Sequence, residues 1–158
     1  MQRGTVEAIY IAAEESQAPT PIEAAHTQPG KGIEGDRYFE GKGRYSDDPR
    51  SDGRDITFVE AEAVEGLARD TGIELGPGET RRNVLTRGVA LNDLVGRRFT
   101  VGETECVGRE LCDPCNHLEK LTQPGVLKGL VNRGGLRADI KRGGTIRPGD
   151  ELRELGAA

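Results

Sequence analysis

The sequence lacks any hydrophobic run long enough to cross a membrane. No stretch approaches the roughly 20 apolar residues that a bilayer-spanning helix needs, and Met1-Gln2-Arg3-Gly4 is not followed by the apolar segment of a signal peptide. These absences predict a soluble, cytoplasmic protein that has no membrane partner. A chain of 158 residues is expected to bury one core, so we predict a single domain, 1–158, with its core at about 6–152.

An excess of positive charge is also missing. Lys and Arg number 22 and Asp and Glu number 27, for a formal net charge of −5. This balance disfavours a surface that tracks phosphates, so we expect no nucleic-acid partner. Lysine is scarce, with 5 lysines against 17 arginines. Arginine favours planar, bidentate recognition of phosphate or carboxylate, so the composition is compatible with a small anionic ligand.

Cysteine is too scarce for a disulfide framework, since the chain has three. Two of them lie in Cys112-Asp113-Pro114-Cys115, which in a reducing compartment indicates metal or thiol chemistry. Asp113 suits a helix N-cap and Pro114 the first helical position, so Cys115 would lie where free N–H groups favour a thiolate. We expect a reactive sulfur of depressed pKa at Cys115, with Arg109 adding positive potential. Cys112 is a candidate resolving thiol.

Other interpretations of the cysteine pair remain open. The two residues can be ordinary buried cysteines at a junction between strand and helix. A zinc site is a further alternative, although the usual second pair of ligands is missing. Its candidate ligands would be Cys112, Cys115, His117 and His26. A thioredoxin-like redox pair would match the local pattern but lacks the βαβ context of that motif.

Glycine and proline are plentiful and together make up about a fifth of the chain. This composition suits short strands and tight corners, and we expect about seven or eight strands with three helical insertions. Strands are predicted at 5–12, 55–59, 81–86 and 136–140, with two more in each of 98–109 and 143–152, and 22–27 can form a further one. A helix is predicted where Ala63, Val64, Leu67 and Ala68 recur at helical spacing, ending at Gly72.

The segment 30–53 is crowded with glycine and charge and has no hydrophobic period. We therefore predict a long loop, mobile at about 40–54, in which Gly35 and Asp36 are candidates for a lid over a site. The expected fold is mainly β with short helices, arranged as a partly closed β-barrel.

Six short motifs follow one another along the chain. They are Gly35-Asp36, Arg82-Asn83, Leu94-Val95-Gly96 with Phe99-Thr100-Val101-Gly102, Pro114-Cys115, Arg133-Gly134-Gly135 and Gly149-Asp150. In this order they resemble a MOSC domain, the module named after the C-terminal part of molybdenum cofactor sulfurase. The resemblance extends from about Val6 to Leu152.

The resemblance implies a β-barrel-like fold, a pocket for the pterin molybdenum cofactor, and one cysteine that carries a persulfide sulfur or ligates molybdenum. The family cysteine falls on Cys115, and the Arg-Asn pair near the pocket falls on Arg82 and Asn83. Arginines suit the cofactor's phosphate; those near the motifs are Arg81, Arg82, Arg109, Arg133 and Arg137. Arg109 and Arg133 are our further cofactor-binding candidates. The implied reaction is sulfur transfer or reduction of N-hydroxylated compounds, and a non-enzymatic binding or delivery module is the alternative.

The sequence departs from the larger family members in one respect. The sulfurase has an N-terminal pyridoxal-phosphate desulfurase domain, and the amidoxime-reducing relatives have an extra N-terminal β domain; we find neither. Sulfur is then expected from a separate cysteine desulfurase, or electrons from electron-transfer proteins. Pyridoxal phosphate, which family descriptions associate with the module, is not supported, because no lysine stands in a recognisable cofactor-binding context.

Overall fold

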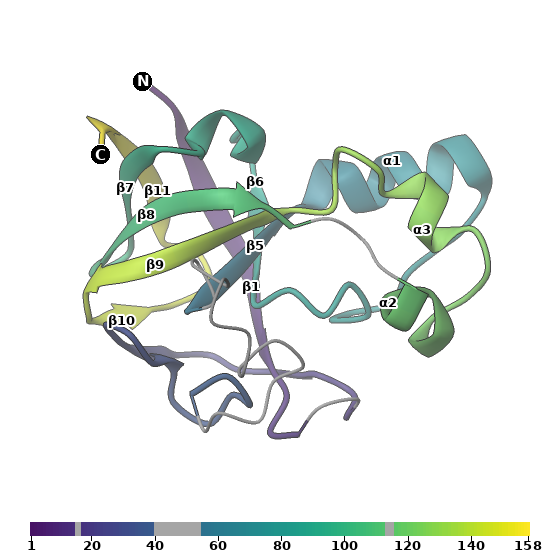
Figure 1. Cartoon of the computed structure of the whole chain (residues 1–158), viewed down its shortest axis with the longest axis horizontal. Coiled ribbons are helices and arrows are strands. Elements are labelled where there is room, and N and C mark those ends of the chain that lie inside the picture. Colours follow the sequence, from purple (N-terminus) through teal and green to yellow (C-terminus); the bar gives the residue numbers. More distant parts are fainter. Residues whose placement is uncertain (15–16, 40–54, 113–115) are drawn as a thin grey trace.

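The structure is a computed structural model that describes residues 1–14, 17–39, 55–112 and 116–158, without the side chains of Asn116 and His117. Within these ranges the chain forms a barrel of strands, a small second sheet beside it, and a group of helices on one side (Figure 1). Both chain termini lie at the same end of the barrel (Figure 1). The loop predicted to be mobile at 40–54 and the predicted helix start at 113–115 lie outside the described residues.

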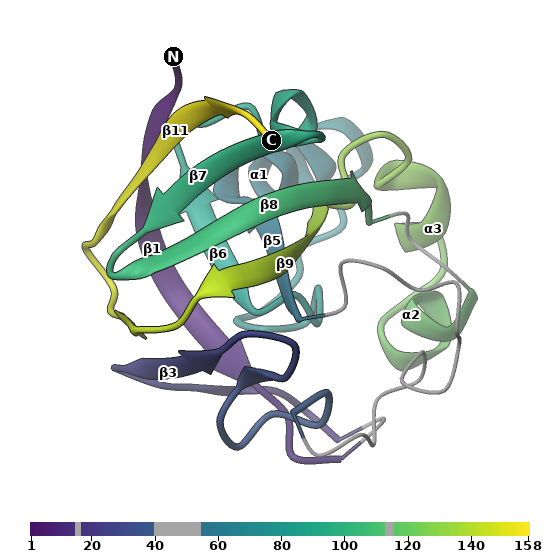
Figure 2. The same cartoon turned by 60° about the vertical axis from the view of Figure 1, so that its left-hand side comes forward.

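Seven strands of the described chain form the barrel (Figure 2). They are β1 (Arg3–Ile11), β5 (Ile56–Glu60), β6 (Val84–Arg87), β7 (Arg97–Val101), β8 (Thr104–Leu111), β9 (Leu136–Arg142) and β11 (Glu151–Ala157). Their order is β11-β7-β8-β9-β5-β6-β1, and pairing of β1 with β11 closes the ring; β2 (Thr20–Pro21) adds to β1. The pair β5–β6 is parallel. The mainly β, barrel-like fold predicted from the sequence is confirmed.

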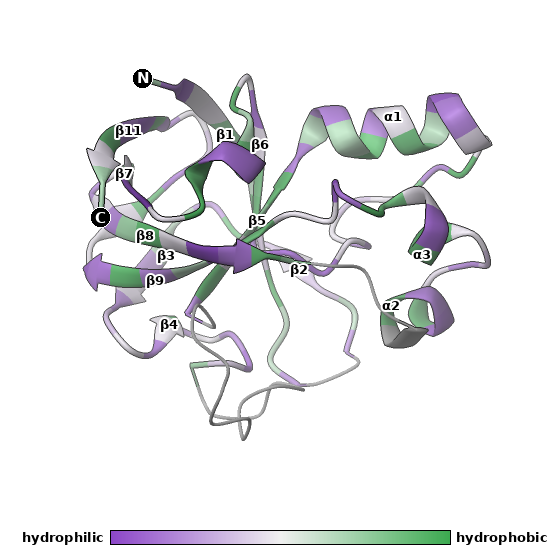
Figure 3. Cartoon of the chain, turned by 45° about the horizontal axis from the view of Figure 1, so that its top comes forward, coloured by the Kyte–Doolittle hydropathy of each residue, from purple (hydrophilic) through white to green (hydrophobic). Residues whose placement is uncertain are grey.

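The core fills the inside of the barrel through alternate strand positions. Leu136, Ala138 and Ile140 of β9 are buried, while the residues between them are more exposed. The rings of Phe58 and Phe99 meet edge to face at the centre, with centroids 5.4 Å apart. Figure 3 shows the resulting alternation of hydrophobic and hydrophilic residues along the strands. Because successive side chains point to opposite faces, polar residues of the same strands face outward.

The small sheet consists of β10 (Thr145–Ile146), β3 (Ala25–Gln28) and β4 (Gly32–Ile33). Strand β4 corrects the prediction that one continuous loop begins at residue 30. Its turn is held by the buried Asp55, whose Oδ2 accepts hydrogen bonds from the Gly30 N–H (3.0 Å) and the Ile140 N–H (2.9 Å). This contact joins segments far apart in sequence, so the local composition of the loop could not show it.

The helices gather beside the barrel and share one apolar cluster. They are α1 (Ala61–Thr71), α2 (Asn116–Leu121) and α3 (Val126–Gly129), and a 3₁₀ turn, η1 (Leu91–Leu94), follows β6. The predicted end of α1 is confirmed, since the Gly72 N–H donates to the Ala68 carbonyl at 2.8 Å. The cluster is formed by Leu67, Leu118, Val126 and Leu130. In the described part of the chain, every helix is too short or too polar to span a bilayer.

Candidate functional site

A basic side chain, Arg137, lies on the outer face of the barrel near the start of β9. In register it lies between Thr57 of β5 and Glu110 of β8. Its neighbours in β9 point into the core, so Arg137 faces outward, yet its side chain is only 15% exposed. Its Nε lies 3.9 Å from the Glu110 carboxylate. Arg137 is therefore a largely buried cation on the outer wall.

The surroundings of Arg137 favour its charged form. Burial opposes the charge, but the nearby Cys112, Tyr38 and Glu110 outweigh burial, and the pKa of Arg137 is raised above its ordinary value. A guanidinium is in any case charged at neutral pH. What matters is therefore where Arg137 lies, because it places a permanent positive charge beside Cys112.

Arg82 places a second guanidinium at Cys112. Its Nε donates to the Gly134 carbonyl at 2.9 Å, and its Nη2 donates to the Cys112 carbonyl at 3.3 Å. The Cys112 N–H in turn donates to the Gly135 carbonyl at 2.7 Å. Cys112 is the last described residue before segment 113–115. Arg82 and Arg137 therefore meet where the chain enters the segment that contains Cys115.

Asn83 is deeply buried and connects three strands. Its Oδ1 accepts from the Thr57 N–H and from the Thr57 hydroxyl, both at 3.1 Å, and its Nδ2 donates to the Tyr10 carbonyl at 3.2 Å. Asn83 itself is 4% exposed. These bonds give Asn83 a structural role, and its predicted contact with a cofactor stays a prediction.

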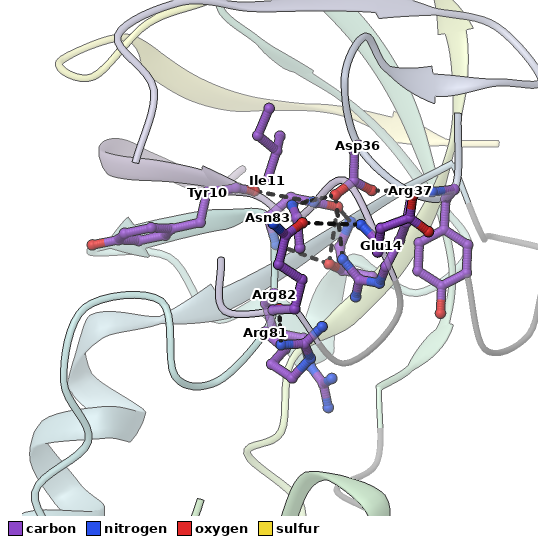
Figure 4. A network of polar contacts seen from close by, with 12 residues as sticks. Tyr10, Ile11, Glu14, Asp36, Arg37, Arg81, Arg82 and Asn83 are labelled. Carbon is purple, nitrogen blue, oxygen red and sulfur yellow. Dashed lines mark hydrogen bonds and ion pairs between the residues drawn. The ribbon is translucent and has the colours of Figure 1, made fainter. Parts of the chain in front are cut away.

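Asp36 fixes a turn to the end of β1. Its Oδ1 accepts from the Ala12 N–H at 3.0 Å, and Arg37 lies 3.3 Å from the same oxygen. The Arg37 guanidinium stacks 4.9 Å from the ring centre of Tyr38. Asp36, Arg37, Asn83 and Arg82 belong to one network of polar contacts (Figure 4). The network brings Tyr38 toward Arg137, a placement that the sequence analysis missed.

Gly35 and Asp36 were predicted to be parts of a lid. The structure shows Asp36 1% exposed and bonded to main chain near β1 and to its own turn, so this part is anchored to the barrel. Gly35 lies close to β1 as well, because a Cβ at this position would come 3.2 Å from a methyl group of Ile11. Whether segment 40–54 covers the site lies outside the described residues.

The two other predicted arginines form ion pairs with the protein. Arg109 donates to Asp139 at 2.7 Å, two residues beyond Arg137 on the same face of β9. Arg133 donates to the Gly129 carbonyl at 2.8 Å and lies 3.2 Å from Asp70, so its side chain turns toward the helices. Their role in binding a cofactor stays a prediction.

The described cysteines differ in their surroundings. Cys106 lies inside the barrel, fully buried, and burial raises the pKa of its thiol far above the ordinary value, with Asp55 and Glu105 adding to the shift. Cys112 is 2% exposed and is a free thiol beside Arg137. Cys115, the predicted reactive residue, lies outside the described residues. Cys106 is thus an inert core residue and a useful internal control.

The zinc alternative receives no support in the described ranges. No group of three His, Cys, Asp or Glu side chains there could hold a metal ion. His26, a candidate fourth ligand, lies on β3 with its Nδ1 3.3 Å from the Thr145 hydroxyl. Cys115 and the side chain of His117 fall outside this description.

The fold and the site together define a small β-barrel protein whose outer wall carries guanidinium groups beside a cysteine-containing segment. The model of one family, the MOSC domain, matches residues 47–153. This match covers more than half of the chain, so the chain belongs to the MOSC domain family. MOSC domains are associated in general with binding of the molybdenum cofactor.

Solved structures share the fold at low sequence identity. The YuaD protein from Bacillus subtilis has a TM-score of 0.81 and 20% identity, over 99% of this chain and 97% of that one. YiiM from Geobacillus stearothermophilus has a TM-score of 0.74 and 14% identity, over 96% of this chain and 75% of that one. YiiM from Escherichia coli has a TM-score of 0.72 and 17% identity, over 100% of this chain and 72% of that one. None of the curated proteins compared with this chain is significantly similar to it in sequence.

Proposed function

We propose that this MOSC protein binds the pterin molybdenum cofactor against the outer wall at Cys112, and that Cys115 supplies the reactive sulfur. The observation that carries the proposal is the convergence of Arg82 and Arg137 on Cys112, three residues before Cys115. The cofactor carries phosphate, which guanidinium groups recognise, and molybdenum accepts sulfur ligands.

The residues present fit such a group. Arg82 is held in place by two main-chain carbonyls, so little side-chain freedom would be lost when an anion binds beside it. Arg137 is held between β5 and β8 and brings its charge to the same point. When bound, the cofactor would supply the redox chemistry of molybdenum. Arg82 and Arg137 would bind and orient its anionic part.

The role of Cys115 is to act as a thiolate. Positive charge close by stabilises the thiolate over the thiol, and the thiolate is both the nucleophile and the metal ligand. As a sulfur carrier, Cys115 would attack the terminal sulfur of a persulfide on a separate cysteine desulfurase. The new S–S bond forms on Cys115 while the donor cysteine leaves as a thiolate, so electrons and atoms balance.

Two reactions are compatible with this site, namely sulfur transfer and reduction of N-hydroxylated compounds. They differ in what the protein must retain. A reductase keeps molybdenum and receives electrons from partner proteins, whereas a sulfur carrier needs only Cys115 and a sulfur donor. A module that only delivers the cofactor would bind it without turnover.

The sulfur on Cys115 can be measured directly. After incubation with a cysteine desulfurase and free cysteine, the intact mass under non-reducing conditions should rise by about 32 Da, one sulfur atom. The Cys115→Ser variant should not gain this mass. Cys106→Ala should gain it like the wild type, because Cys106 is sealed in the core. An adduct that persists in Cys115→Ser would place the sulfur on another cysteine and refute this role of Cys115.

A further inference from the structure

A cavity of about 220 Å³ lies beside the proposed site. It is lined by β1, β5, α1, β6 and the segment between α1 and β6, and Arg82 forms part of its wall. Most of the lining is apolar, from Val59, Val64, Leu75 and Leu85. We infer that this cavity binds an aromatic ring that carries an oxygen acceptor, and that this ring is part of the protein's small-molecule substrate.

The volume suits an occupant of one ring with a small substituent. An apolar cavity of roughly 150 Å³ engineered into a protein core stays dry and binds benzene. The present cavity is larger than that by the size of a small polar group. It is smaller than the roughly 300 Å³ at which pockets for drug-sized ligands begin. A ligand of one ring and a few further atoms therefore fits.

The walls favour a flat ligand. One side includes the ring of Tyr10, and Gly78 lies directly on that ring, because a Cβ at Gly78 would come 3.0 Å from Tyr10 Cδ1. Gly76 and Gly78 add no side chains, so this part of the wall is formed by peptide groups. Arg82 is also a lining residue, and aromatic rings stack well on a planar guanidinium. A planar ring makes more contact with such surfaces than a puckered aliphatic one.

The cavity also has a polar part, which is formed by residues just before β6 in the chain. Thr80, with a buried side chain, and Arg82 both line it, and the Thr80 hydroxyl is also close to the Arg82 N–H at 3.5 Å. A hydroxyl and a guanidinium can both donate hydrogen bonds, so an acceptor oxygen on the ligand suits this part. A cationic substituent would meet the charge of Arg82 instead and should be rejected.

Arg82 links the cavity to the sulfur site. Arg82 lines the cavity, and its Nη2 donates to the Cys112 carbonyl at 3.3 Å. A ring bound in the cavity would thus lie one arginine side chain from the segment that contains Cys115. Binding of the ring stands on the cavity alone, whereas its identity as the substrate's ring rests on the proposed function.

The test is a titration of the full chain, without cofactor, with benzamide, followed by amide NMR shifts. We expect saturable shifts at Leu75, Gly76 and Gly78 with a Kd on the order of 1 mM, usual for a ligand of about nine heavy atoms. Benzylamine, the cationic analogue, and acetamide, which lacks the ring, should bind at least ten-fold more weakly. Absence of saturable shifts for benzamide, or equal binding of benzylamine, would overturn the inference.

Substitutions in the wall of the cavity test whether benzamide binds there. Val64→Phe should raise the benzamide Kd at least ten-fold by filling the cavity from α1, and Leu85→Phe should do so from β6, a second route if the first variant fails to fold. Arg69→Phe adds the same side chain at an exposed position of α1 and should leave the Kd unchanged. Equal affinity in folded Val64→Phe or Leu85→Phe would place benzamide elsewhere and refute the assignment. Cys115→Ser should bind benzamide normally, so failure of the sulfur proposal would be seen separately.

Discussion

Replacing Gly135 by alanine is expected to prevent the barrel from folding stably. The residue has φ of 116°, and an added Cβ would lie 2.0 Å from the Phe58 carbonyl oxygen. Relief of that overlap would separate β5 from β9, which pair at Phe58 and Leu136. We expect a loss of more than about 4 kcal/mol in the free energy of unfolding, at the upper end for single substitutions. Urea denaturation followed by circular dichroism measures it.

Gly149→Ala is the matched control for this prediction. Gly149 also has positive φ, 94°, but a Cβ there would meet nothing within 4 Å. Its substitution should cost only the backbone strain, about 1–3 kcal/mol. If both variants lost the same stability, the close approach of Gly135 to β5 would not be what requires glycine there.

Asn83→Ala is expected to destabilise the protein by about 3–5 kcal/mol, because buried hydrogen-bonding groups that lose their partner each cost about 1–3 kcal/mol. The variant leaves the Thr57 N–H and the Tyr10 carbonyl without the Asn83 amide. The change also loosens the contact between β1, β5 and β6. Chemical denaturation of the purified variant gives the free energy directly.

The same substitution at Asn92 provides the control. Asn92 is exposed, and its amide donates to the Asn132 carbonyl at the surface. Asn92→Ala should therefore change stability by less than about 1 kcal/mol. A stable Asn83→Ala variant that instead lost bound molybdenum would contradict the structural role and restore the sequence-based assignment of Asn83 to the cofactor.

Local patterns made much of the fold predictable. Helix α1 follows from apolar residues at helical spacing and a glycine stop, and both signals act within a few residues. The paired strands β7 and β8 follow from apolar runs on either side of Gly102-Glu103. Strand β4 was missed because it depends on Asp55, which lies more than twenty residues away in sequence.

The candidate site was predictable only in part. The motifs pointed to Arg82, and the structure shows how its guanidinium reaches Cys112. Arg137 was noted among the arginines but not selected, because only the register of β9 against β5 and β8 places it beside the cysteine. The alternation of Arg137 with Leu136 and Ala138 was the one local signal that it faces outward. No local sequence pattern indicated that Arg37 and Tyr38 lie near the candidate site, because a turn in a glycine-rich segment places them there.

The central claim is that the molybdenum cofactor binds where Arg82 and Arg137 meet Cys112. The most direct measurement is the molybdenum content of protein purified from cells grown with molybdate, compared between wild type, Arg137→Gln and Arg97→Gln. The account predicts about one molybdenum per chain in the wild type, as for a protein-bound metal cofactor. It predicts a loss of at least ten-fold in Arg137→Gln and little change in Arg97→Gln, whose ion pair with Glu154 joins β7 to β11. Wild-type protein free of molybdenum, or an Arg137→Gln variant that retains it fully, would contradict the account.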